Sequence, residues 1–368
     1  SSHIDRVVSE GMQSTVGAGL LAKEPSATPE ISGHRRHASS HIDRVVSEGM
    51  QSTVGAGLLA KEPSAIPEIK GMNTQPRIAL IGECMIELQH RADGSLQQSF
   101  GGDTLNTAVY LRRELGAVGT VDYVTALGDD SFSDAMCQQW RDEGLGLDRV
   151  QRLPGRLPGL YCIQTDANGE RKFLYWRNEA AVRDCFTTPA AEPILAALPD
   201  YDVVYFSGIT LAVLGEIGRE RLLQSLIETR RRGGKVVFDN NYRPRLWTSV
   251  EAARAAYHRV LAEVDIALLT EDDERVLFGY ADSEQVFAAY PAIAEVVLKR
   301  GAQACLIRCA GERFAVPALQ VENVVDTTAA GDSFSAAYLA SRLTGGSPEA
   351  AALAGHRLAS RVIQVPGA

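Results

Sequence analysis

The chain has 368 residues, of which 45% are hydrophobic and 23% are charged, as is typical of a globular protein with room for one large core or two smaller ones. A formal net charge of −9 disfavours nonspecific binding to nucleic acid. No apolar run approaches the roughly 20 residues that span a bilayer, so we expect neither nucleic acid nor a membrane as partner. The six cysteines are scattered without a CxxC pair, which favours a reducing, cytoplasmic location over a thiol-based metal site.

The N-terminal segment differs from the rest of the chain. Residues 1–32 and 39–70 are near-copies of each other. Two copies do not make a solenoid, and neither has the apolar core and cleavage site of a secretory signal. Each copy contains GAGLLA, a match to a dinucleotide fingerprint, but no strand precedes it, so we interpret the match as false. We expect residues 1–71 to be a duplicated leader, non-native or disordered, and 72–368 to be the functional domain.

Apolar strands and helices alternate along the functional domain. Strands are predicted at 77–82, 121–128, 201–208, 235–241, 264–270 and 295–301. Helices are predicted at 103–116, with Asp103 or Thr104 as cap, at 131–144 and at 216–232. Near-continuous apolar strands separated by helices predict an α/β fold with three layers, in which a doubly wound, mostly parallel sheet is covered by helices on both faces.

Two segments break this alternation and predict a lid. Residues 83–102 and 160–177 alternate between apolar and polar positions, and the second segment has Asn168-Gly169 at a hairpin turn. We expect them to form a small antiparallel sheet that closes over a ligand at the carboxyl edge of the main sheet. An exposed apolar face of such a lid would be buried if the lids of two copies packed together, so we expect a homodimer that forms through the lids.

The stretch DTTAAGDSFSAAYLA, residues 326–340, predicts an anion site at the start of a helix. Unpaired N–H groups and a partial positive charge mark the first helical turn, and Ala329, Ala330 and Gly331 leave it open to a phosphate. Asp332 follows where a carboxylate could take a proton from an attacking hydroxyl. An ordinary helix start with an acidic first turn is the alternative.

Glycines and polar residues also gather before the first predicted helix. Gly101 and Gly102 would let the backbone approach a ligand closely, and Asp103 and Asn106 offer directed hydrogen bonds. A plain glycine turn before a helix is the alternative.

Further candidate ligand-binding residues lie on a lid strand and at the end of a strand of the main sheet. Tyr175 and Arg177 share one side of a lid strand, where Arg177 suits a carboxylate or a surface ion pair. Asp239, Asn241 and Arg243 end a strand where a parallel sheet presents its ligands, unless they form only a structural turn.

Two further strand ends carry charge. Residues 271–274 are four acids that could steer Mg²⁺ through water or simply form an acidic first turn. Lys299 and Gly301 could meet phosphate or ribose, or mark a hairpin. Together these strand ends and one helix start favour phosphoryl transfer.

These motifs resemble a known family. DTTAAGDSFSA and GGDTLNTAVYL resemble the two signatures of the ribokinase-like (PfkB) carbohydrate kinases, and the likeness runs from about Arg77 to the end of the chain. The runs IGECMIEL, FGGDTLNTAVY, FDNNYRPRLW and VLKRGA resemble most closely the members that act on 2-keto-3-deoxygluconate. The resemblance implies a ribokinase-like fold, ATP and Mg²⁺ as cofactors, and transfer of the γ-phosphoryl group to the C6 hydroxyl, giving 2-keto-3-deoxy-6-phosphogluconate in Entner–Doudoroff or uronate catabolism.

The resemblance also implies roles for individual residues. Asp332 matches the catalytic base, and Ala329, Ala330 and Gly331 match the anion hole. The substrate positions match Gly101, Gly102, Asp103, Asn106, Tyr161, Tyr175, Arg177 and Arg243. The nucleotide positions match Asn241, Arg243, Lys299, Gly301, Gly331, Gly355 and His356. Glu274 matches the position that binds Mg²⁺ through water. Two positions depart from the pattern, since Ala329 replaces a usual Gly and Glu271 replaces a usual Asn.

The substrate is expected to be a sugar acid. A 2-keto acid needs a cation, and Arg177 and Arg243 are the best candidates. One alternative is a kinase of the same fold acting on fructose or 2-keto-gluconate. A second is a catalytically dead sugar-binding module, against which the presence of Asp332 argues.

Overall fold

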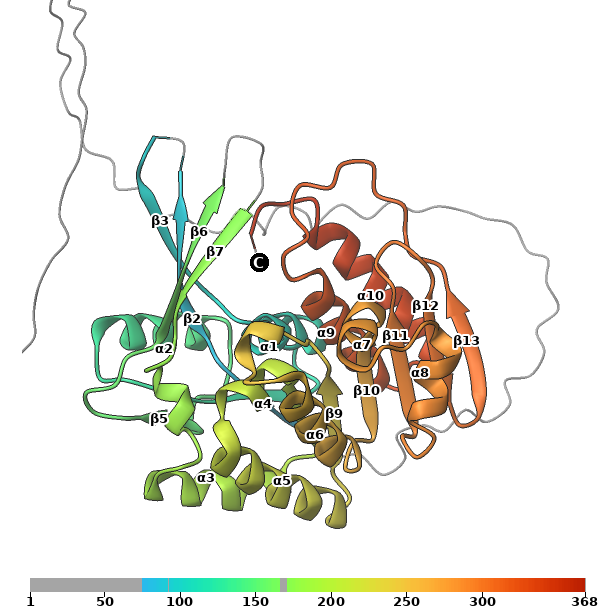
Figure 1. Cartoon of the computed structure of the whole chain (residues 1–368), viewed down its shortest axis with the longest axis horizontal. Helices are drawn as coiled ribbons and strands as arrows, with labels where there is room; N and C mark the ends of the chain where they lie inside the picture. The colour runs from blue at the N-terminus through green and yellow to red at the C-terminus, as the bar shows by residue number, and fades with distance from the viewer. Residues whose placement is uncertain (1–74, 92, 166–170, 368) are drawn as a thin grey trace, which may run out of the picture. The chain divides into compact units, whose positions relative to one another are not determined.

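The computed structural model describes residues 75–91, 93–165 and 171–367, which form a nine-stranded and a four-stranded sheet (Figure 1). The strands of the large sheet are β1 (Arg77–Ile81), β4 (Thr120–Leu127), β5 (Val150–Arg152), β8 (Val203–Ser207), β9 (Lys235–Asp239), β10 (Ile266–Thr270), β11 (Glu295–Lys299), β12 (Cys305–Cys309) and β13 (Glu312–Val316). Those of the small sheet are β2 (Met85–His90), β3 (Leu96–Gly101), β6 (Gly159–Thr165) and β7 (Arg171–Trp176).

Ten α-helices lie within the described residues. They are α1 (Asp103–Leu115), α2 (Ser131–Asp142), α3 (Glu192–Ala197), α4 (Gly208–Val213), α5 (Gly215–Arg231), α6 (Val250–Leu261), α7 (Glu271–Phe278), α8 (Ser283–Ala289), α9 (Ala330–Leu343) and α10 (Pro348–Val362). None of these helices has both the length and the apolar character needed to cross a membrane.

The large sheet has the predicted doubly wound, mostly parallel form. Its order is β13-β12-β11-β10-β9-β8-β1-β4-β5, and every pairing from β11 to β5 is parallel. The two strands at the other edge, β12 and β13, are antiparallel. All six strands predicted for the body of the domain are therefore confirmed, with ends that differ by up to two residues.

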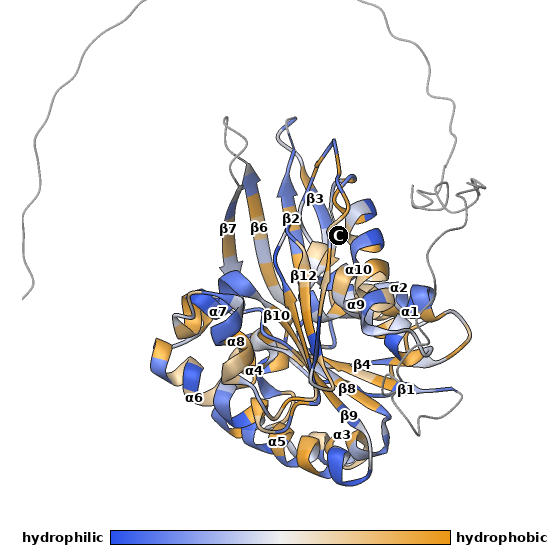
Figure 2. Ribbon diagram, turned by 90° about the vertical axis from the view of Figure 1, so that its right-hand side faces the viewer, coloured by the Kyte–Doolittle hydropathy of each residue, from blue (hydrophilic) through white to orange (hydrophobic). Residues whose placement is uncertain are grey.

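Hydrophobic cores cover both faces of this sheet. Along β1, Ile78 and Leu80 join a core with α1, α2, α9 and α10, whereas Ala79 and Ile81 join a core with α3 to α8. Figure 2 shows the apolar residues gathered along the strands and the polar residues on the outward helix faces. Because both sides of β1, β8, β9, β10 and β11 are buried, these strands are apolar along most of their length instead of alternating, whereas the edge strand β13 is largely exposed.

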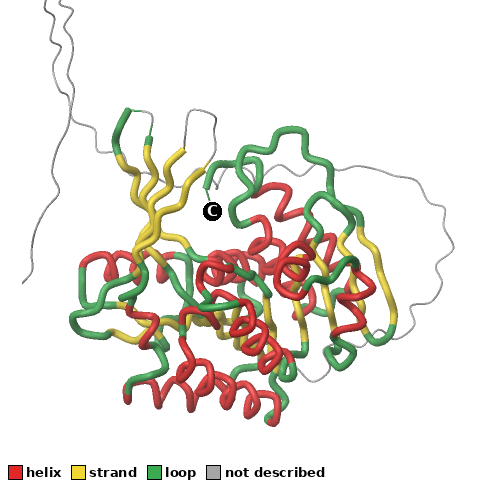
Figure 3. Tube along the Cα trace, viewed as in Figure 1, coloured by secondary structure: helices red, strands yellow, loops and turns green. Residues whose placement is uncertain are grey.

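The small sheet is formed by the two segments that interrupt the alternation, as predicted. Its order is β3-β2-β6-β7, in which β2 pairs antiparallel with β3 and β6 antiparallel with β7. The central pairing of β2 with β6 is parallel, so the small sheet consists of two antiparallel hairpins joined along their first strands. Figure 3 shows these strands at the upper left, apart from the strands of the large sheet. The predicted turn at Asn168-Gly169 lies outside the described residues.

A close backbone approach determines where α1 starts. Gly102 precedes the helix, and a Cβ there would lie 2.1 Å from the carbonyl oxygen of Glu83. Only glycine fits such a contact. The helix begins at Asp103 without a side-chain cap, so the prediction that Asp103 or Thr104 caps it was wrong. This start aims Asp103 and Asn106 at the carboxyl ends of the parallel strands.

Candidate active site

A pocket of ≈430 Å³ lies where the lid meets the carboxyl ends of the parallel strands. That position and that size are typical of small-molecule sites in doubly wound folds. Its lining comprises Met85, Gly102, Asp103, Asn106, Tyr161, Phe173, Tyr175, Ile209, Asp239, Asn241, Arg243, Thr270, Asp273, Lys299 and the run Thr327 to Asp332. The structure thus brings together residues from the lid, from α1, from three strand ends and from α9.

The start of α9 presents unpaired amides to the pocket. Ala329, just before the helix, has the left-handed values φ 58° and ψ 11°. The N–H of Ala330 donates to the Thr327 carbonyl at 3.2 Å, and that of Ser333 donates to Ala329 at 2.8 Å. Within the described residues, the N–H groups of Gly331 and Asp332 have no hydrogen-bond acceptor. Free amides at a helix N-terminus after a left-handed residue form an anion site.

The left-handed backbone explains why the family pattern has Gly at the position of Ala329. A φ of 58° suits glycine, and an alanine there costs about 1–2 kcal/mol. The small Cβ leaves the amides that follow open to the pocket.

Asp332, in the first turn of α9, lies half-buried beside these amides. Its Oδ2 accepts a hydrogen bond from Nδ2 of Asn106 at 2.9 Å. Burial raises the pKa of Asp332 to about 8, and the charges of Asp103 and Asp239 contribute to the rise, whereas the Asn106 hydrogen bond and the Lys299 charge oppose it. A raised pKa makes the ionised carboxylate a stronger base, so the ionised form of Asp332 is a good acceptor for a hydroxyl proton, although most of the group is protonated at pH 7.

A second carboxylate, Asp103, faces the same space from the start of α1. Its Oδ2 accepts a hydrogen bond from Nδ2 of Asn241 at 2.7 Å. Asn241 has φ 24°, unusual for a residue with a side chain, and its N–H donates to Oδ1 of Asn240. Burial raises the pKa of Asp103 above its ordinary value, even though the Ser207 and Asn241 hydrogen bonds favour the charged form.

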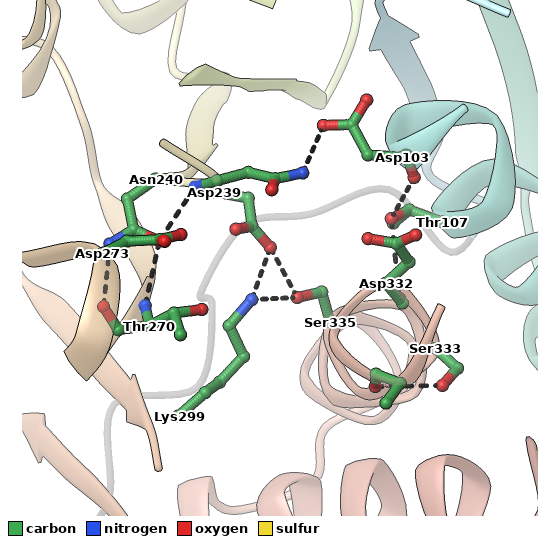
Figure 4. A network of polar contacts seen from close by, with 12 residues as sticks. Asp103, Thr107, Asp239, Asn240, Thr270, Asp273, Lys299, Asp332, Ser333 and Ser335 are labelled. Atoms are coloured by element: carbon green, nitrogen blue, oxygen red, sulfur yellow. Dashed lines mark hydrogen bonds and ion pairs between the residues drawn. The ribbon is translucent and has the colours of Figure 1, made fainter. Parts of the chain in front are cut away.

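Lys299 and Asp239 form an ion pair at the base of the pocket (Figure 4). The ammonium Nζ lies 2.6 Å from Oδ2 of Asp239 and 3.2 Å from Oγ of Ser335. Ser335 in turn donates to the same Asp239 oxygen at 2.9 Å. The sequence placed Lys299 and Asp239 at strand ends but did not reveal their pairing. Ser335 was missed, although it stands three residues after Asp332, on the same face of α9.

Arg243 is a cation in the pocket lining that is exposed and has only a long ion-pair contact. Its side chain is 53% exposed, and its nearest carboxylate is Asp273 at 3.7 Å. Asp273 itself accepts a hydrogen bond from the N–H of Tyr242. The Arg243 guanidinium therefore keeps donors that a bound carboxylate could use.

Arg177, the other candidate cation, has a different partner. It is 8% exposed and forms an ion pair with Glu83, which is 2% exposed. Arg177 is absent from the pocket lining, whereas Tyr175, two residues before it, faces the pocket. The guanidinium of Arg177 is therefore paired with a buried carboxylate at the base of the lid and does not line the pocket.

Aromatic rings form the lid wall of the pocket. The rings of Tyr161 and Tyr175 lie 5.8 Å apart, and those of Phe173 and Tyr175 lie stacked at 6.3 Å. The Tyr161 hydroxyl donates to Glu87, and burial raises the Tyr161 pKa above its ordinary value. Apolar lining residues were missed by sequence reasoning, because their residue types do not differ from those of core positions: Met85, Phe173 and Ile209.

Two glycines with predicted ligand roles lie just outside the lining. A Cβ on Gly101 would come within 2.7 Å of the Tyr161 hydroxyl, so this glycine at the end of β3 makes room for the hydroxyl of Tyr161. Gly301 has φ 57° and turns the chain from β11 into β12.

Gly355 and His356, predicted beside the nucleotide, hold α10 against α9. A Cβ on Gly355 would lie 2.7 Å from the ring of Phe334. The His356 ring packs edge-on against Phe334, with its Nε2 3.1 Å from the Val316 carbonyl oxygen. Neither residue lines the pocket.

Glu274, the predicted metal position, is buried behind the pocket wall. Its oxygens accept hydrogen bonds from Asn240 at 3.0 Å and Tyr290 at 2.6 Å. Burial raises its pKa to about 7, against those two hydrogen bonds. No group of three or more His, Cys, Asp or Glu side chains suited to a metal occurs within the described part of the chain. These residues do not form a protein cage for a metal.

Comparisons with known proteins identify related chains. Residues 75–368 match the family described as pfkB family carbohydrate kinase. A 2-dehydro-3-deoxygluconokinase of Dickeya dadantii is 53% identical over 301 residues, which cover 80% of this chain and 97% of the relative. The 2-dehydro-3-deoxygluconokinase of Haemophilus influenzae is 41% identical and covers 79% and 95% of the two chains.

Solved structures share the fold at low sequence identity. A 2-dehydro-3-deoxygluconokinase from Thermotoga maritima has a TM-score of 0.68 at 23% identity, covering 80% of this chain and 95% of that one. Ribokinase II from Escherichia coli, in complex with ATP and Mg²⁺, has a TM-score of 0.69 at 22% identity, covering 79% and 94%. The ribokinase-like fold predicted from the sequence is confirmed.

The raised pKa of Asp332 predicts a pH-dependent effect of Asp332→Asn on stability. The folded-state pKa, about 8, lies above the ordinary value of 3.8. The stability that the protonated carboxyl contributes is therefore complete below about pH 4 and is lost as the pH rises through about 8. Since Asn cannot ionise, the variant should gain melting temperature over the parent by more at about pH 9 than at about pH 5.5.

Scanning calorimetry at the two pH values measures this difference. Asp272→Asn is the matched control, because the Asp272 side chain is 80% exposed and should give the same difference at both pH values. An Asp332→Asn gain that does not grow with pH would contradict the raised pKa.

Proposed function

The chain belongs to the pfkB family of carbohydrate kinases, and from that premise we propose that it transfers the γ-phosphoryl group of ATP to the C6 hydroxyl of 2-keto-3-deoxygluconate, also called 2-dehydro-3-deoxygluconate. The relatives named for that substrate, 41–53% identical, support the choice of sugar. Within this chain, the main support for a sugar-acid substrate is the position of Arg243. Its guanidinium has hydrogen-bond donors available to a ligand, and it lines the same pocket as Asp332 and the amides at the start of α9. A sugar carboxylate needs such a partner, and a neutral sugar does not.

The proposed reaction uses the geometry at the start of α9. Asp332 accepts the proton of the C6 hydroxyl while the hydroxyl oxygen bonds to the γ-phosphorus and the bond to the β-γ bridging oxygen breaks, releasing ADP. The N–H groups of Gly331 and Asp332 donate to the phosphoryl oxygens as their charge is redistributed. Asn106 holds the carboxylate in place through its 2.9 Å hydrogen bond. The lid wall of Tyr161 and Tyr175 limits the access of water to this centre.

Mg²⁺ would enter this site with ATP. When bound, it neutralises part of the triphosphate charge, and it typically keeps several waters and few protein ligands. The described residues agree with such a role, because they provide no cage and Glu274 already uses both oxygens for hydrogen bonds. Glu274 then orients Asn240, which holds the β9 and β10 strand ends together through Thr270.

The cysteines support a cytoplasmic location for this activity. All six are free and buried. Unpaired thiols are typical of reducing compartments.

The proposed function predicts a substrate order and the effect of removing the base. The wild-type protein should phosphorylate 2-keto-3-deoxygluconate in preference to 2-keto-gluconate, fructose and ribose when ATP and Mg²⁺ are supplied. Asp332→Asn should lower kcat by several orders of magnitude with little change in KM, because it removes proton acceptance and keeps the shape of the side chain. A coupled assay of ADP release measures both; near-normal kcat in the variant would reject Asp332 as the base.

Arg243→Ala should raise KM for the keto acid specifically. A lost charge-assisted hydrogen bond corresponds to a rise of roughly tenfold or more. Arg245→Ala is the matched control, since Arg245 is exposed, lies two residues away and is absent from the pocket lining. Steady-state kinetics with 2-keto-3-deoxygluconate and with fructose separates the effects. An equal change for both sugars would assign Arg243 to ATP or to structure instead.

We also propose that two copies pair through the outer faces of their lids. Phe173 and Tyr175 face the pocket, whereas Leu174 and Trp176 alternate with them and are 41% and 60% exposed. Exposed apolar side chains of this size on an open sheet favour an interface with a second lid.

Trp176→Glu should convert such a dimer into monomers. A charge in the centre of an apolar interface is costly when it has no partner. Sedimentation velocity at matched concentrations measures the mass, with Ile217→Glu, another exposed apolar site at 66%, as control. A wild-type protein that sediments as a monomer would refute the dimer.

A further inference from the structure

One buried cation lies among the carboxylates of the site. Lys299 is the last residue of β11, Asp239 is the last residue of β9, and Asp332 and Ser335 lie on α9. Figure 4 shows Lys299 and Ser335 converging on Asp239, with Asp332 on the neighbouring turn of the helix. Lys299 and Asp239 both line the pocket, so their ion pair belongs to its wall and not to a distant part of the fold.

Three donors hold Asp239 through a single oxygen. Its Oδ2 accepts from Lys299 at 2.6 Å, from Ser335 at 2.9 Å and from the Tyr205 hydroxyl at 3.3 Å. A buried ion pair gains little net stability, because taking both charges out of water offsets their attraction. So many donors on one oxygen instead fix the position of the lysine ammonium, which a flexible four-carbon stem would otherwise leave free.

The ammonium held in this way lies next to the anion site. A Cβ on Gly331 would lie 3.8 Å from the Lys299 Nζ. Asp239 and Ser335 use two of the three ammonium N–H donors. The third remains for a negatively charged group in the pocket.

We propose that Asp239 is a positioning residue which, with Ser335, fixes the Lys299 ammonium beside Gly331, where it stabilises the transferring phosphoryl group and balances the charge around Asp332. The inference rests on the proposed function, since it assigns Lys299 to that phosphoryl group. It adds Asp239 and Ser335 to the residues on which the chemistry depends, through the lysine that they hold.

The charges facing Asp332 make the proposal measurable. Asp239 and Asp103 raise the pKa of Asp332, and Lys299 lowers it. Two tyrosines also interact with Asp332, Tyr110 on α1 and Tyr205 on β8; burial raises the pKa of both, so they stay neutral near pH 8. Removing the Asp239 charge should therefore lower the pKa of Asp332, and removing the Lys299 charge should raise it.

The test compares pH profiles of kcat/KM for Asp239→Asn, Lys299→Met and the wild type. We expect kcat to fall about tenfold or more in both variants with a smaller change in sugar KM. The acidic limb should move to lower pH in Asp239→Asn and to higher pH in Lys299→Met, each by about half a unit or more. Asp134→Asn, which changes an exposed carboxylate on α2, should leave the limb unchanged.

Ser335→Ala provides a variant with unchanged charge. It removes one of the three donors on Asp239, so kcat should fall by about threefold or more while the acidic limb stays in place. This variant keeps the proposal testable if Asp239→Asn does not fold. A Ser335→Ala enzyme with wild-type kcat, or limbs that move in the same direction in both charge variants, would overturn the inference.

A titration of the Asp332 carboxyl by ¹³C NMR separates this inference from the proposed function. The assignment comes from the signal lost in Asp332→Asn, and the measurement needs no turnover. Opposite pKa shifts in the two charge variants would support the electrostatic arrangement whatever the sugar. A wild type that phosphorylates no sugar would refute the proposed function, whereas unshifted titrations in an active enzyme would refute the inference alone.

Discussion

The site depends on the convergence of three carboxylates on a small amount of positive charge. Asp103, Asp239 and Asp332 come from α1, β9 and α9, and each is kept near the others by the fold despite mutual repulsion. The ammonium of Lys299 and the partial positive charge of the amides at the start of α9 offset part of this negative charge. Because parallel strands end at one edge of the sheet, the chain brings these groups together from positions up to 229 residues apart (332 − 103). Phosphate and sugar carboxylate groups would add further negative charge, for which the free amides of α9 and the guanidinium of Arg243 provide donors.

Much of the fold was predictable because its signals are local. Strands buried on both faces are apolar throughout, helices between them keep their period, and two alternating segments stand out as a lid. The catalytic proposal for Asp332 was also local, since Ala-Ala-Gly before a carboxylate describes an open helix start. For Gly102 the sequence predicted a close backbone approach to a ligand, whereas the close approach seen in the structure is to the carbonyl oxygen of Glu83.

Pairings between distant residues were not predictable from the sequence. The residue type of Arg177 suits a substrate carboxylate. In the structure, however, its guanidinium forms an ion pair with Glu83, which is 94 residues away in the chain. Lys299 could have met ribose, but Asp239 and Ser335 hold it at the helix start. Gly355 and His356 match a nucleotide position in the family pattern, yet they pack α10 on α9. The residue type shows which hydrogen bonds and ion pairs a side chain can form. Which partner it contacts depends on how the fold places distant segments beside one another.

The structure of the reaction product tests most directly whether Asp332 activates the C6 hydroxyl. Incubation of the protein with ATP, Mg²⁺ and 2-keto-3-deoxygluconate, followed by ³¹P and ¹³C NMR, identifies which hydroxyl carries phosphate. We expect one phosphate ester, at C6, formed together with ADP and absent when Asp332 is replaced by Asn. Release of inorganic phosphate without an ester, or an ester formed as readily by Asp332→Asn, would contradict a mechanism in which Asp332 activates that hydroxyl at the α9 amides.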